Sequence, residues 1–478
     1  MTLKARIRAV DRFIKGCKED GIYADLQAAC VMAGWDSLAG ALTPLVGAAP
    51  TNSGLSNYDR GIGIAGDGSS YLDSGRAVNA DGDADHHIAA YITGGTIDNG
   101  KYAAGSMSTA TTYTICGYGM FSRNSSAAGL ANATAGLTAV SRSTSSEYLW
   151  KKSGGLVQTA TAAAIDATLG INHFVFAFNH PTAGVQGRSS ATLSFYSIGS
   201  SLGSDPATGL AALDARVSTL MADLRAIEEA GFDRDAIAYI RAVEEADGGA
   251  YLETDVKVAI NNLVSGLKSD GLWDAMASSC LLCGPRTLAG ALVPLRGDAP
   301  TPYGFVSGDH SRTDGLRDPD GTSYLDSGFN VSAEYLNDVH ISAYSTLDPG
   351  GTFKSVMGAY NPTVPSSLHM SSRTTGITSN VNNTFTTSAS DTDGIGFVGV
   401  SRTDAANANA RAGGTTFTEP DASTEVSGLN VFVFARNNNG SVSTSDMRLA
   451  FYSAGTFLDL AKLDSHVSAY VTAIGAAI

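Results

Sequence analysis

Long apolar runs are missing from this sequence. No segment approaches the ~20 consecutive apolar residues that a membrane-spanning helix needs, so we expect no membrane insertion. Met1 is followed by Thr-Leu-Lys-Ala-Arg, in place of the apolar core of a secretion signal. Cysteine is scarce too, and its five copies offer no paired disulfide framework. These absences indicate a globular protein without a signal peptide, made and folded in a reducing cytoplasm.

Charged side chains are also few, at 16% of the chain, and the formal net charge is −15. The longest basic cluster is the pair Lys151-Lys152. A nucleic-acid-binding protein needs a basic surface that displaces counterions from phosphate groups, so nucleic acid is excluded as an expected partner. The same charge disfavours an anionic membrane surface. Glycine, in contrast, is abundant at 54 residues, which predicts many tight turns.

The second half of the sequence repeats the first. Tyr71-Leu72-Asp73-Ser74-Gly75 returns unchanged at 324–328. Other matched phrases are 38–42 with 288–292, 49–51 with 299–301, 87–88 with 340–341, 140–142 with 400–402, 174–177 with 432–435, and 195–197 with 451–453. A repeat this long indicates a duplicated domain, because solenoid repeats are much shorter. We predict a first domain at 1–228, a helical linker at 229–252 and a second domain at 253–478.

Each half begins with helical periodicity. Apolar residues spaced by three and four predict helices over 3–32 and, in the second copy, over 255–282. Asp20-Gly21 and Asp270-Gly271 break each stretch into two helices, since glycine commonly ends a helix. Further helices are predicted at 210–229, 235–245 and 458–477.

The periodicity then changes to short strands. From 42 to 197 and from 292 to 453, runs rich in Val, Ile, Tyr, Phe and Thr alternate with turn residues. Many short strands with frequent turns are typical of a β-sandwich of the jelly-roll type. The predicted fold class is therefore mainly β with α, in the form of two tandem β-sandwich domains, each preceded and followed by helices.

The repeated phrases also carry a resemblance to a known family. The segments 288–301, 308–316 and 320–327 resemble modules of virion structural proteins of tailed bacteriophages, and 266–273 is similar to the phrase that precedes such a module. The resemblance implies a concanavalin A-like, laminin-G-like jelly roll, present twice. The first copy departs from the pattern: Tyr23 stands where the second copy has Trp273, and Asp36-Ser37 replaces Arg286-Thr287.

That resemblance implies a virion protein: a tail fibre, a head spike or a similar surface appendage of a phage-like particle. Its expected partners are other virion proteins, namely capsid, spike or tail subunits in a homo- or hetero-oligomer, and the host surface polysaccharide. Two alternatives stay open: a purely structural decoration or connector protein, and a glycan-degrading enzyme. No cofactor is expected.

The acidic residues argue against catalysis. A glycoside hydrolase needs two carboxyl groups on either side of the sugar bond. The only acidic pair that both copies contain is Asp67 with Asp73, repeated as Asp320 with Asp326. Aspartate in such Gly- and Ser-rich phrases commonly accepts hydrogen bonds from turn amides. We interpret these aspartates as turn caps and expect no enzyme activity.

Two further patterns invite a metal site. Asp81, Asp83 and Asp85 alternate before His86-His87, but they lack the glycine and glutamate of an EF-hand calcium loop. These aspartates are weak candidates, and His87 and His340 are interpreted as half-buried residues that begin strands. Cys280 and Cys283 have no second cysteine pair, so we expect them to be buried apolar side chains.

Candidate glycan-binding residues come from repeated arginines and from aromatic side chains. A guanidinium can bind a sugar carboxylate in a bidentate manner, and Arg142 recurs as Arg402, although a structural salt bridge is the more common role of such an arginine. Aromatic rings provide platforms for sugar rings. The main aromatic candidates are Tyr148, Trp150 and Tyr360; Tyr102, Tyr113, Tyr118, Tyr303 and Tyr335 are further candidates.

The N-terminal helix is basic although the chain is acidic. Its basic side chains include Arg6, Arg8, Arg12 and Lys15. A basic helix is attracted to an acidic neighbouring surface. We expect this helix to anchor the protein to the particle, and we expect residues 1–17 to be removable without loss of the fold.

Overall fold

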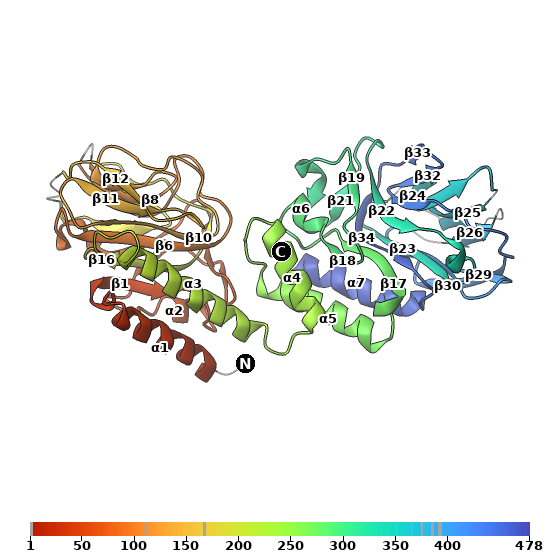
Figure 1. Cartoon of the computed structure of the whole chain (residues 1–478), viewed down its shortest axis with the longest axis horizontal. Coiled ribbons are helices and arrows are strands. Elements are labelled where there is room, and N and C mark those ends of the chain that lie inside the picture. Colours follow the sequence, from red (N-terminus) through yellow and green to blue (C-terminus); the bar gives the residue numbers. More distant parts are fainter. Residues whose placement is uncertain are drawn as a thin grey trace. The chain divides into compact units, whose positions relative to one another are not determined.

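The structure is a computed structural model that describes residues 3–109, 112–165, 169–348, 350, 352–364, 366–373, 376–383, 387–390 and 394–478. The chain forms two compact units: unit 1 contains Met1–Gly231 and Gly248–Thr254, and unit 2 contains Phe232–Asp247 and Asp255–Ile478. Each unit is mainly β with helices near its ends, as the sequence predicts (Figure 1). The segment expected as a linker, 229–252, is divided between the two units.

Unit 1 is a sandwich of two sheets. We call the sheet on which the long helices lie the inner sheet and the other one the outer sheet. The inner sheet has the strand order β12-β11-β10-β6-β16-β4-β3, with β1 paired to β16. The outer sheet has the order β15-β14-β7-β13-β5-β2, with β8 paired to β7 and β9 to β8. The elements are α1 (Leu3–Glu19), η1 (Tyr23–Asp25), β1 (Leu26–Val31), α2 (Leu38–Ala41), β2 (Thr51–Ser53), β3 (Tyr58–Asp59), β4 (Gly63–Ala65), β5 (Tyr71–Ala77), η2 (Val78–Ala80), β6 (His86–Gly94), β7 (Tyr102–Thr109), β8 (Thr112–Gly117), β9 (Phe121–Asn124), β10 (Gly136–Arg142), β11 (Glu147–Lys151), β12 (Gln158–Thr161), β13 (Asn172–Val175), β14 (Phe178–His180), β15 (Gly184–Gln186), β16 (Thr192–Gly199) and α3 (Gly209–Glu228).

Unit 2 repeats this arrangement. Its inner sheet has the order β18-β17-β34-β23-β28-β29-β30, with β21 paired to β34 and β20 to β21. Its outer sheet has the order β19-β22-β31-β24-β25-β26-β27, with β32 paired to β24 and β33 to β32. The elements are α4 (Arg234–Ala246), α5 (Thr254–Ser269), η3 (Trp273–Ala275), β17 (Met276–Leu281), α6 (Leu288–Ala291), β18 (Pro294–Arg296), β19 (Thr301–Tyr303), η4 (Ser307–Asp309), β20 (His310–Ser311), β21 (Gly315–Arg317), β22 (Tyr324–Asn330), η5 (Ala333–Tyr335), β23 (Val339–Ser345), β24 (Lys354–Asn361), β25 (Ser366–Arg373), β26 (Gly376–Asn383), β27 (Thr387–Ser390), β28 (Gly396–Arg402), β29 (Asn407–Ala412), β30 (Thr415–Pro420), β31 (Asn430–Val433), β32 (Ala435–Asn438), β33 (Ser441–Thr444), β34 (Arg448–Gly455) and α7 (Leu460–Ala477).

The two units share their strand order, as the sequence repeat predicts. The inner-sheet series β10-β6-β16 of unit 1 corresponds to β28-β23-β34 of unit 2, and the outer-sheet series β2-β5-β13-β7 corresponds to β19-β22-β31-β24. Matched phrases therefore occupy matched strands. A residue that both copies retain at one strand position consequently lies on the same face of both sandwiches.

The long helices lie on the inner sheet. In unit 1, Phe13 of α1 and Leu213 of α3 pack with Phe195 of β16 in one buried cluster. In unit 2, α7 packs against β28. The closing helices confirm the sequence prediction, and so does α4 over the stretch expected at 235–245. No described helix is both long and apolar enough to cross a bilayer.

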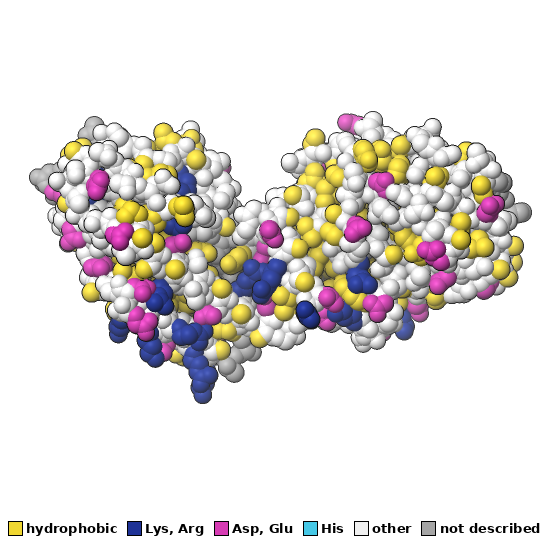
Figure 2. Space-filling model, viewed as in Figure 1, with side chains coloured by type: hydrophobic (Ala, Val, Ile, Leu, Met, Phe, Trp, Pro, Cys, Tyr) yellow, Lys and Arg dark blue, Asp and Glu magenta, His cyan; other side chains and the backbone are white. Residues whose placement is uncertain are grey.

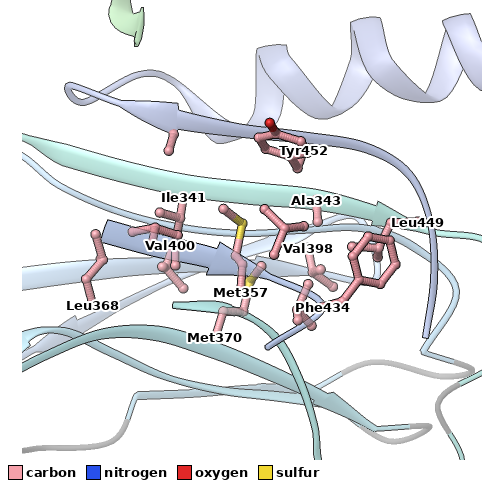
Figure 3. Packing of buried hydrophobic residues seen from close by; sticks show 14 of the residues in the cluster. Ile341, Ala343, Met357, Leu368, Met370, Val398, Val400, Phe434, Leu449 and Tyr452 are labelled. Carbon is pink, nitrogen blue, oxygen red and sulfur yellow. The ribbon is translucent and has the colours of Figure 1, made fainter. Parts of the chain in front are cut away.

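The main core of unit 2 lies between its two sheets (Figure 3). Ile341 and Val400 from the inner sheet meet Met357 and Met370 from the outer sheet, and all four are fully buried. The inner sheet is thus buried on both faces, by helices and by the outer sheet. Among the described residues, the strands of the outer sheet have no extensive contact with a long helix.

The second helix predicted within 3–32, and its counterpart within 255–282, do not exist. Gly21, with φ +75°, ends α1, and the chain then forms the strand β1. The equivalent segment of unit 2 forms β17. Both strands belong to the inner sheet and are buried almost throughout, so their apolar residues do not alternate and the run resembles helical spacing.

Candidate functional site

The outer sheets of both units carry the same group of four side chains. In unit 1, Asn172 Nδ2 donates a 2.9 Å hydrogen bond to Asp73 Oδ1, and the rings of Tyr71 and Phe174 lie 4.5 Å apart. These four residues come from the neighbouring strands β5 and β13. An aromatic pair beside a carboxylate and amide pair presents both an apolar face and hydrogen-bonding groups to a ligand.

Unit 2 repeats this group and extends it. Asn430 Nδ2 donates to Asp326 at 3.1 Å, and Tyr324 stacks on Phe432 with a centroid distance of 4.7 Å. Tyr303 then stacks on Tyr324 at 4.6 Å, with an interplanar angle of 11°. Tyr303, Tyr324 and Phe432 form an aromatic ladder across three adjacent strands, β19, β22 and β31.

Strand alternation explains why this ladder faces outward. In β22, Leu325 is fully buried in the core, while its neighbours Tyr324 and Asp326 are only half-buried. Tyr303 lies on the edge strand β19, opposite Tyr324, and is 45% exposed. In unit 1 the residue opposite Tyr71 is Ser53, so the ladder there is one ring shorter.

A cavity of about 290 Å³ in unit 2 is bordered by Ser327–Asn330 at the end of β22, and we call it the side pocket. Asn330 Nδ2 donates to Asn430 Oδ1 at 3.1 Å, which connects the pocket to the Asp326–Asn430 pair. Burial, followed by the charges of Glu334 and Asp338, raises the pKa of Tyr335. The pocket is lined by Ala277, Ser278, Asp298, Ser327, Gly328, Phe329, Asn330, Ser332, Glu334 and Tyr335.

The predicted turn caps are confirmed for three of the four aspartates. Asp67 accepts from the amides of Ser69 and Ser70, at 2.7 and 2.6 Å. Asp73 and Asp326 accept from Gly75 at 2.9 Å and Gly328 at 3.0 Å.

The fourth aspartate, Asp320, needs a correction. In unit 2 the buried Asp318 accepts from Thr322 and Ser323, both at 3.1 Å, and occupies the capping role expected of Asp320. Asp320 instead lines a different cavity. A proline between the two aspartates, Pro319, shows that the second copy has a longer turn here than the first.

Arg142 is not a sugar ligand. It is fully buried, and its guanidinium donates to the carbonyl oxygens of Ser122, Thr144 and Ala162 at 2.8, 3.1 and 3.0 Å. Desolvation lowers the pKa of this arginine. Tyr148 is equally closed to a ligand: it is 2% exposed, and its hydroxyl donates to Met120. Arg142 thus ties β9 to the inner sheet through Ser122, and Tyr148 does so through Met120, the residue before β9.

Arg402 plays the same structural role in unit 2. It is fully buried, donates to the carbonyl oxygens of Val381 and Asp421 at 3.0 and 2.6 Å, and lies 3.5 Å from the Asp421 carboxylate. The repeated arginines therefore follow from the repeated fold. The sequence left a structural role and a sugar-binding role open for Arg142 and Arg402, and the geometry favours the structural role.

Two of the remaining aromatic candidates, Tyr102 and Tyr113, both contact Phe178 in the outer sheet of unit 1, at ring-centroid distances of 5.4 and 6.5 Å. Trp150 is half-buried and packs against the core between the sheets of unit 1. Tyr360 is half-buried under the Arg436 guanidinium, which lies 5.4 Å from its ring. Of the candidates that the sequence suggested, Tyr303 and Tyr335 are the two that the structure places at the ladder and the side pocket. Tyr324, Phe432 and Asn430 were not expected, although the repeated Tyr-Leu-Asp-Ser-Gly phrase marked that strand.

The weak metal candidates do not converge. Asp81 pairs with Arg76, whose Nε lies 2.8 Å from Oδ2, and Asp85 accepts from the Ser201 amide at 2.7 Å. Within the described ranges, no group of three or more His, Cys, Asp or Glu side chains is arranged to hold a metal ion.

The histidines and cysteines of the sequence interpretation are structural. His87 and His340 lie in β6 and β23 and are fully buried, not half-buried, because the inner sheet is covered on both faces. Burial lowers the pKa of each to about 4. Cys280 and Cys283 are buried as predicted, and desolvation raises the pKa of both thiols to about 12.

The basic residues of α1 divide into inward and outward sets. Arg6 is 3% exposed and pairs with Asp36 at 2.7 Å, so it is not free to anchor the protein. Arg12 and Lys15 are exposed and pair with Asp223 and Asp11 at 2.7 Å.

Arg8 belongs to the outward set and is exposed, like Lys4. The exposed apolar side chains Leu3 and Ile7 lie beside them. Figure 2 shows basic side chains gathered along α1.

Two other cavities offer less to a ligand. One in unit 2, of about 430 Å³, is bordered by Lys354 and Asp446, whose side chains pair at 2.6 Å. One in unit 1, of about 250 Å³, is bordered by Lys151 and Asp214, which pair at 3.1 Å. In each, a lysine and an aspartate of the lining pair with each other.

No family model matches the chain, and no curated protein matches it. Among solved structures, it is similar to the Ruminococcus gnavus IT-sialidase CBM40, with 15% identity and a TM-score of 0.23 over 32% of this chain and 96% of that chain. The Botulinum neurotoxin serotype D binding domain has 9% identity and a TM-score of 0.31 over 42% and 52%. A Trypanosoma rangeli sialidase mutant displaying trans-sialidase activity has 7% identity and a TM-score of 0.31 over 71% and 51%. These scores are too low to bear on what this chain does.

Proposed function

We propose that this chain is a surface protein of a tailed phage or phage-like particle that attaches to a host surface glycan without cleaving it. The observation that carries the glycan part is the aromatic ladder beside the Asp326–Asn430 pair. It lies on the outer sheet, whose described strands have no extensive contact with a long helix. The particle part rests on the sequence resemblance to virion structural proteins.

The chemistry of this face suits a sugar. A pyranose ring has an apolar face of C–H groups that stacks on an aromatic ring, and hydroxyls at its rim that need hydrogen-bond partners. Tyr303 supplies an exposed ring that is already held flat by Tyr324, so little side-chain entropy is lost on binding. The Asp326 carboxylate accepts hydrogen bonds, and the Asn430 amide both donates and accepts.

Replacing Tyr303 with serine is expected to weaken glycan binding by about tenfold or more, equivalent to about 1.4 kcal/mol. The change converts the ladder of unit 2 into the shorter one of unit 1. The reciprocal change, Ser53→Tyr, is expected to strengthen binding by unit 1, because residue 53 faces Tyr71 as Tyr303 faces Tyr324. Titration of host capsule or lipopolysaccharide oligosaccharides by calorimetry measures both effects.

Phe353→Ser is the matched control for Tyr303→Ser. Phe353 is another exposed aromatic residue of unit 2, at 41% exposure, but it borders the larger cavity. A loss of binding in Phe353→Ser and none in Tyr303→Ser would move the site to that cavity. Binding that neither change affects would contradict the proposed site.

The proposed function includes no catalysis, and the chain length of a polysaccharide after incubation with the protein tests this. Asp298 and Glu334 are both exposed at the side pocket, whereas the acid of a glycosidase is typically held in an apolar environment. Host polysaccharide incubated with the protein is expected to keep its chain length. If the wild-type protein shortens the polysaccharide and the Glu334→Gln variant leaves it intact, the enzyme alternative is established.

We also propose that α1 docks the protein to an acidic surface of another virion subunit. The outward face of α1 combines the exposed Leu3 and Ile7 with the exposed Lys4 and Arg8. Apolar side chains among like charges, on a chain with net charge −15, are typical of a contact surface for an acidic partner. If the protein docks through α1 but binds no glycan, it fits the alternative of a purely structural decoration or connector protein.

The double change Lys4→Glu with Arg8→Glu is expected to reduce the amount of this protein on assembled particles by about tenfold or more. Both side chains are exposed, so the fold is expected to remain. Quantitative gel analysis of purified particles measures occupancy. Lys101→Glu with Lys462→Glu changes the charge equally at exposed sites elsewhere and serves as the control. Full occupancy of the α1 variant would place the anchor on another surface.

A further inference from the structure

The charged groups at the ladder and the side pocket of unit 2 all have the same sign. Asp326 lies beside the ladder, and Asp298 and Glu334 line the pocket. None of the described residues that line the pocket is Lys or Arg. This distinguishes the side pocket from the larger cavity of unit 2, where Lys354 neutralises Asp446 at 2.6 Å.

A continuous row of polar side chains connects the two features. Asp326 accepts from Asn430, whose carbonyl oxygen accepts from Asn330, and Asn330 lines the pocket. The register of β22 against β31 shifts between Asp326, opposite Phe432, and Asn330, opposite Asn430. Tyr324 and Asn330 are therefore about four strand steps apart, or about 13 Å at the rise of an extended strand. A ligand that touches both features must therefore be longer than a single sugar.

We propose that unit 2 binds an extended, uncharged glycan that stacks on the aromatic ladder, follows the row from Asp326 to Asn330 and ends in the side pocket. This inference rests on the proposed function and adds the ligand class. Sugar hydroxyls donate hydrogen bonds to the carboxylates along this path and exchange bonds with the two amides.

An acidic glycan is excluded by electrostatics. A carboxylate or sulfate on the sugar would approach Asp298, Glu334 and Asp326 without a cation to offset them, and like charges in close contact at an interface are strongly unfavourable. The negative field acts on the pocket itself. Burial, followed by the charges of Glu334 and Asp338, raises the pKa of Tyr335, and burial, followed by Tyr303 and then Asp326, raises the pKa of Tyr324.

The ligand class is tested with one acidic bacterial polysaccharide that is compared with the same polymer after chemical reduction of its carboxyl groups to hydroxymethyl groups. The backbone is unchanged, so the comparison isolates charge. The reduced polymer is expected to bind at least about tenfold more tightly at 50 mM salt. The double variant Asp298→Asn with Glu334→Gln is expected to reduce the difference in affinity between the acidic and the reduced polymer. It removes the two pocket charges and keeps the side-chain shapes.

The path is tested with uncharged oligosaccharides of increasing length that derive from the polymer that binds. Glu334→Ala is expected to weaken binding of the longer members about fivefold, the loss of one good hydrogen bond, and to leave members that reach only the ladder unchanged. Tyr303→Ser is expected to weaken binding of all lengths. An equal effect of Glu334→Ala at every length, or none at any length, would contradict the path to the pocket.

The outcomes separate the inference from the proposed function. Tighter, salt-sensitive binding of the acidic polymer would overturn the uncharged class while glycan binding itself stood. No binding of either polymer, nor of any member of an array of neutral and acidic bacterial glycans, would contradict glycan binding as a whole and with it this inference.

Discussion

Replacing Phe13 with alanine is expected to lower the free energy of unfolding of unit 1 by about 3 to 5 kcal/mol, the usual cost of an emptied aromatic site in a core. Phe13 is 3% exposed and meets the ring of Phe195 edge to face at 5.7 Å. Helix α1 is thus part of the core and not an appendage. Urea unfolding of the full chain, followed by circular dichroism, measures the loss.

Ile7→Ala is the control for this prediction, since Ile7 lies on the same helix and is 51% exposed. It is expected to change stability little. Equal effects of both changes would show that α1 contributes by helix formation and not by packing. The burial of Phe13 and Cys17 also corrects the expectation that residues 1–17 can be removed with the fold intact, because their removal would uncover the inner sheet.

Replacing Arg142 with methionine is expected to destabilise unit 1 by about 3 to 5 kcal/mol. Methionine fills much of the same volume but leaves the buried carbonyl oxygens of Ser122, Thr144 and Ala162 without their donors. Calorimetric thermal unfolding of the full chain measures the change. Arg12→Met removes a guanidinium of a mainly exposed ion pair and is expected to have little effect.

The same variant separates a structural role for Arg142 from a role in sugar binding. At a temperature where Arg142→Met remains folded, glycan binding is expected to be unchanged, because the native guanidinium is fully buried. Reduced binding with unchanged stability would instead restore this arginine as a ligand-binding residue.

Much of the fold could be predicted from the sequence because the repeat and the strand periodicity are local signals. The matched phrases at 71–75 and 324–328 occupy β5 and β22, the same position in both outer sheets. The prediction failed at Leu26–Val31, where a strand buried on both faces has no alternation to distinguish it from a helix.

The candidate site was less predictable. Arg142 and Arg402 are repeated because each holds loop carbonyls of a repeated fold, and repetition alone does not distinguish this from two equivalent binding sites. Tyr303 was one of many aromatic candidates. Only its place opposite Tyr324, on an edge strand of the outer sheet, separates it from Tyr148, which points into the core.

The sequence by itself determined the duplication, the β-rich class and the closing helices, since each depends on residues near one another in the chain. Only the tertiary structure decided which face of each sandwich is uncovered and which side chains meet on it. The ladder joins residues 303, 324 and 432 through the pairing of β19, β22 and β31. Strand pairing over such separations is set by the packing of the whole unit, because each strand gains its stability from neighbours that are remote in sequence.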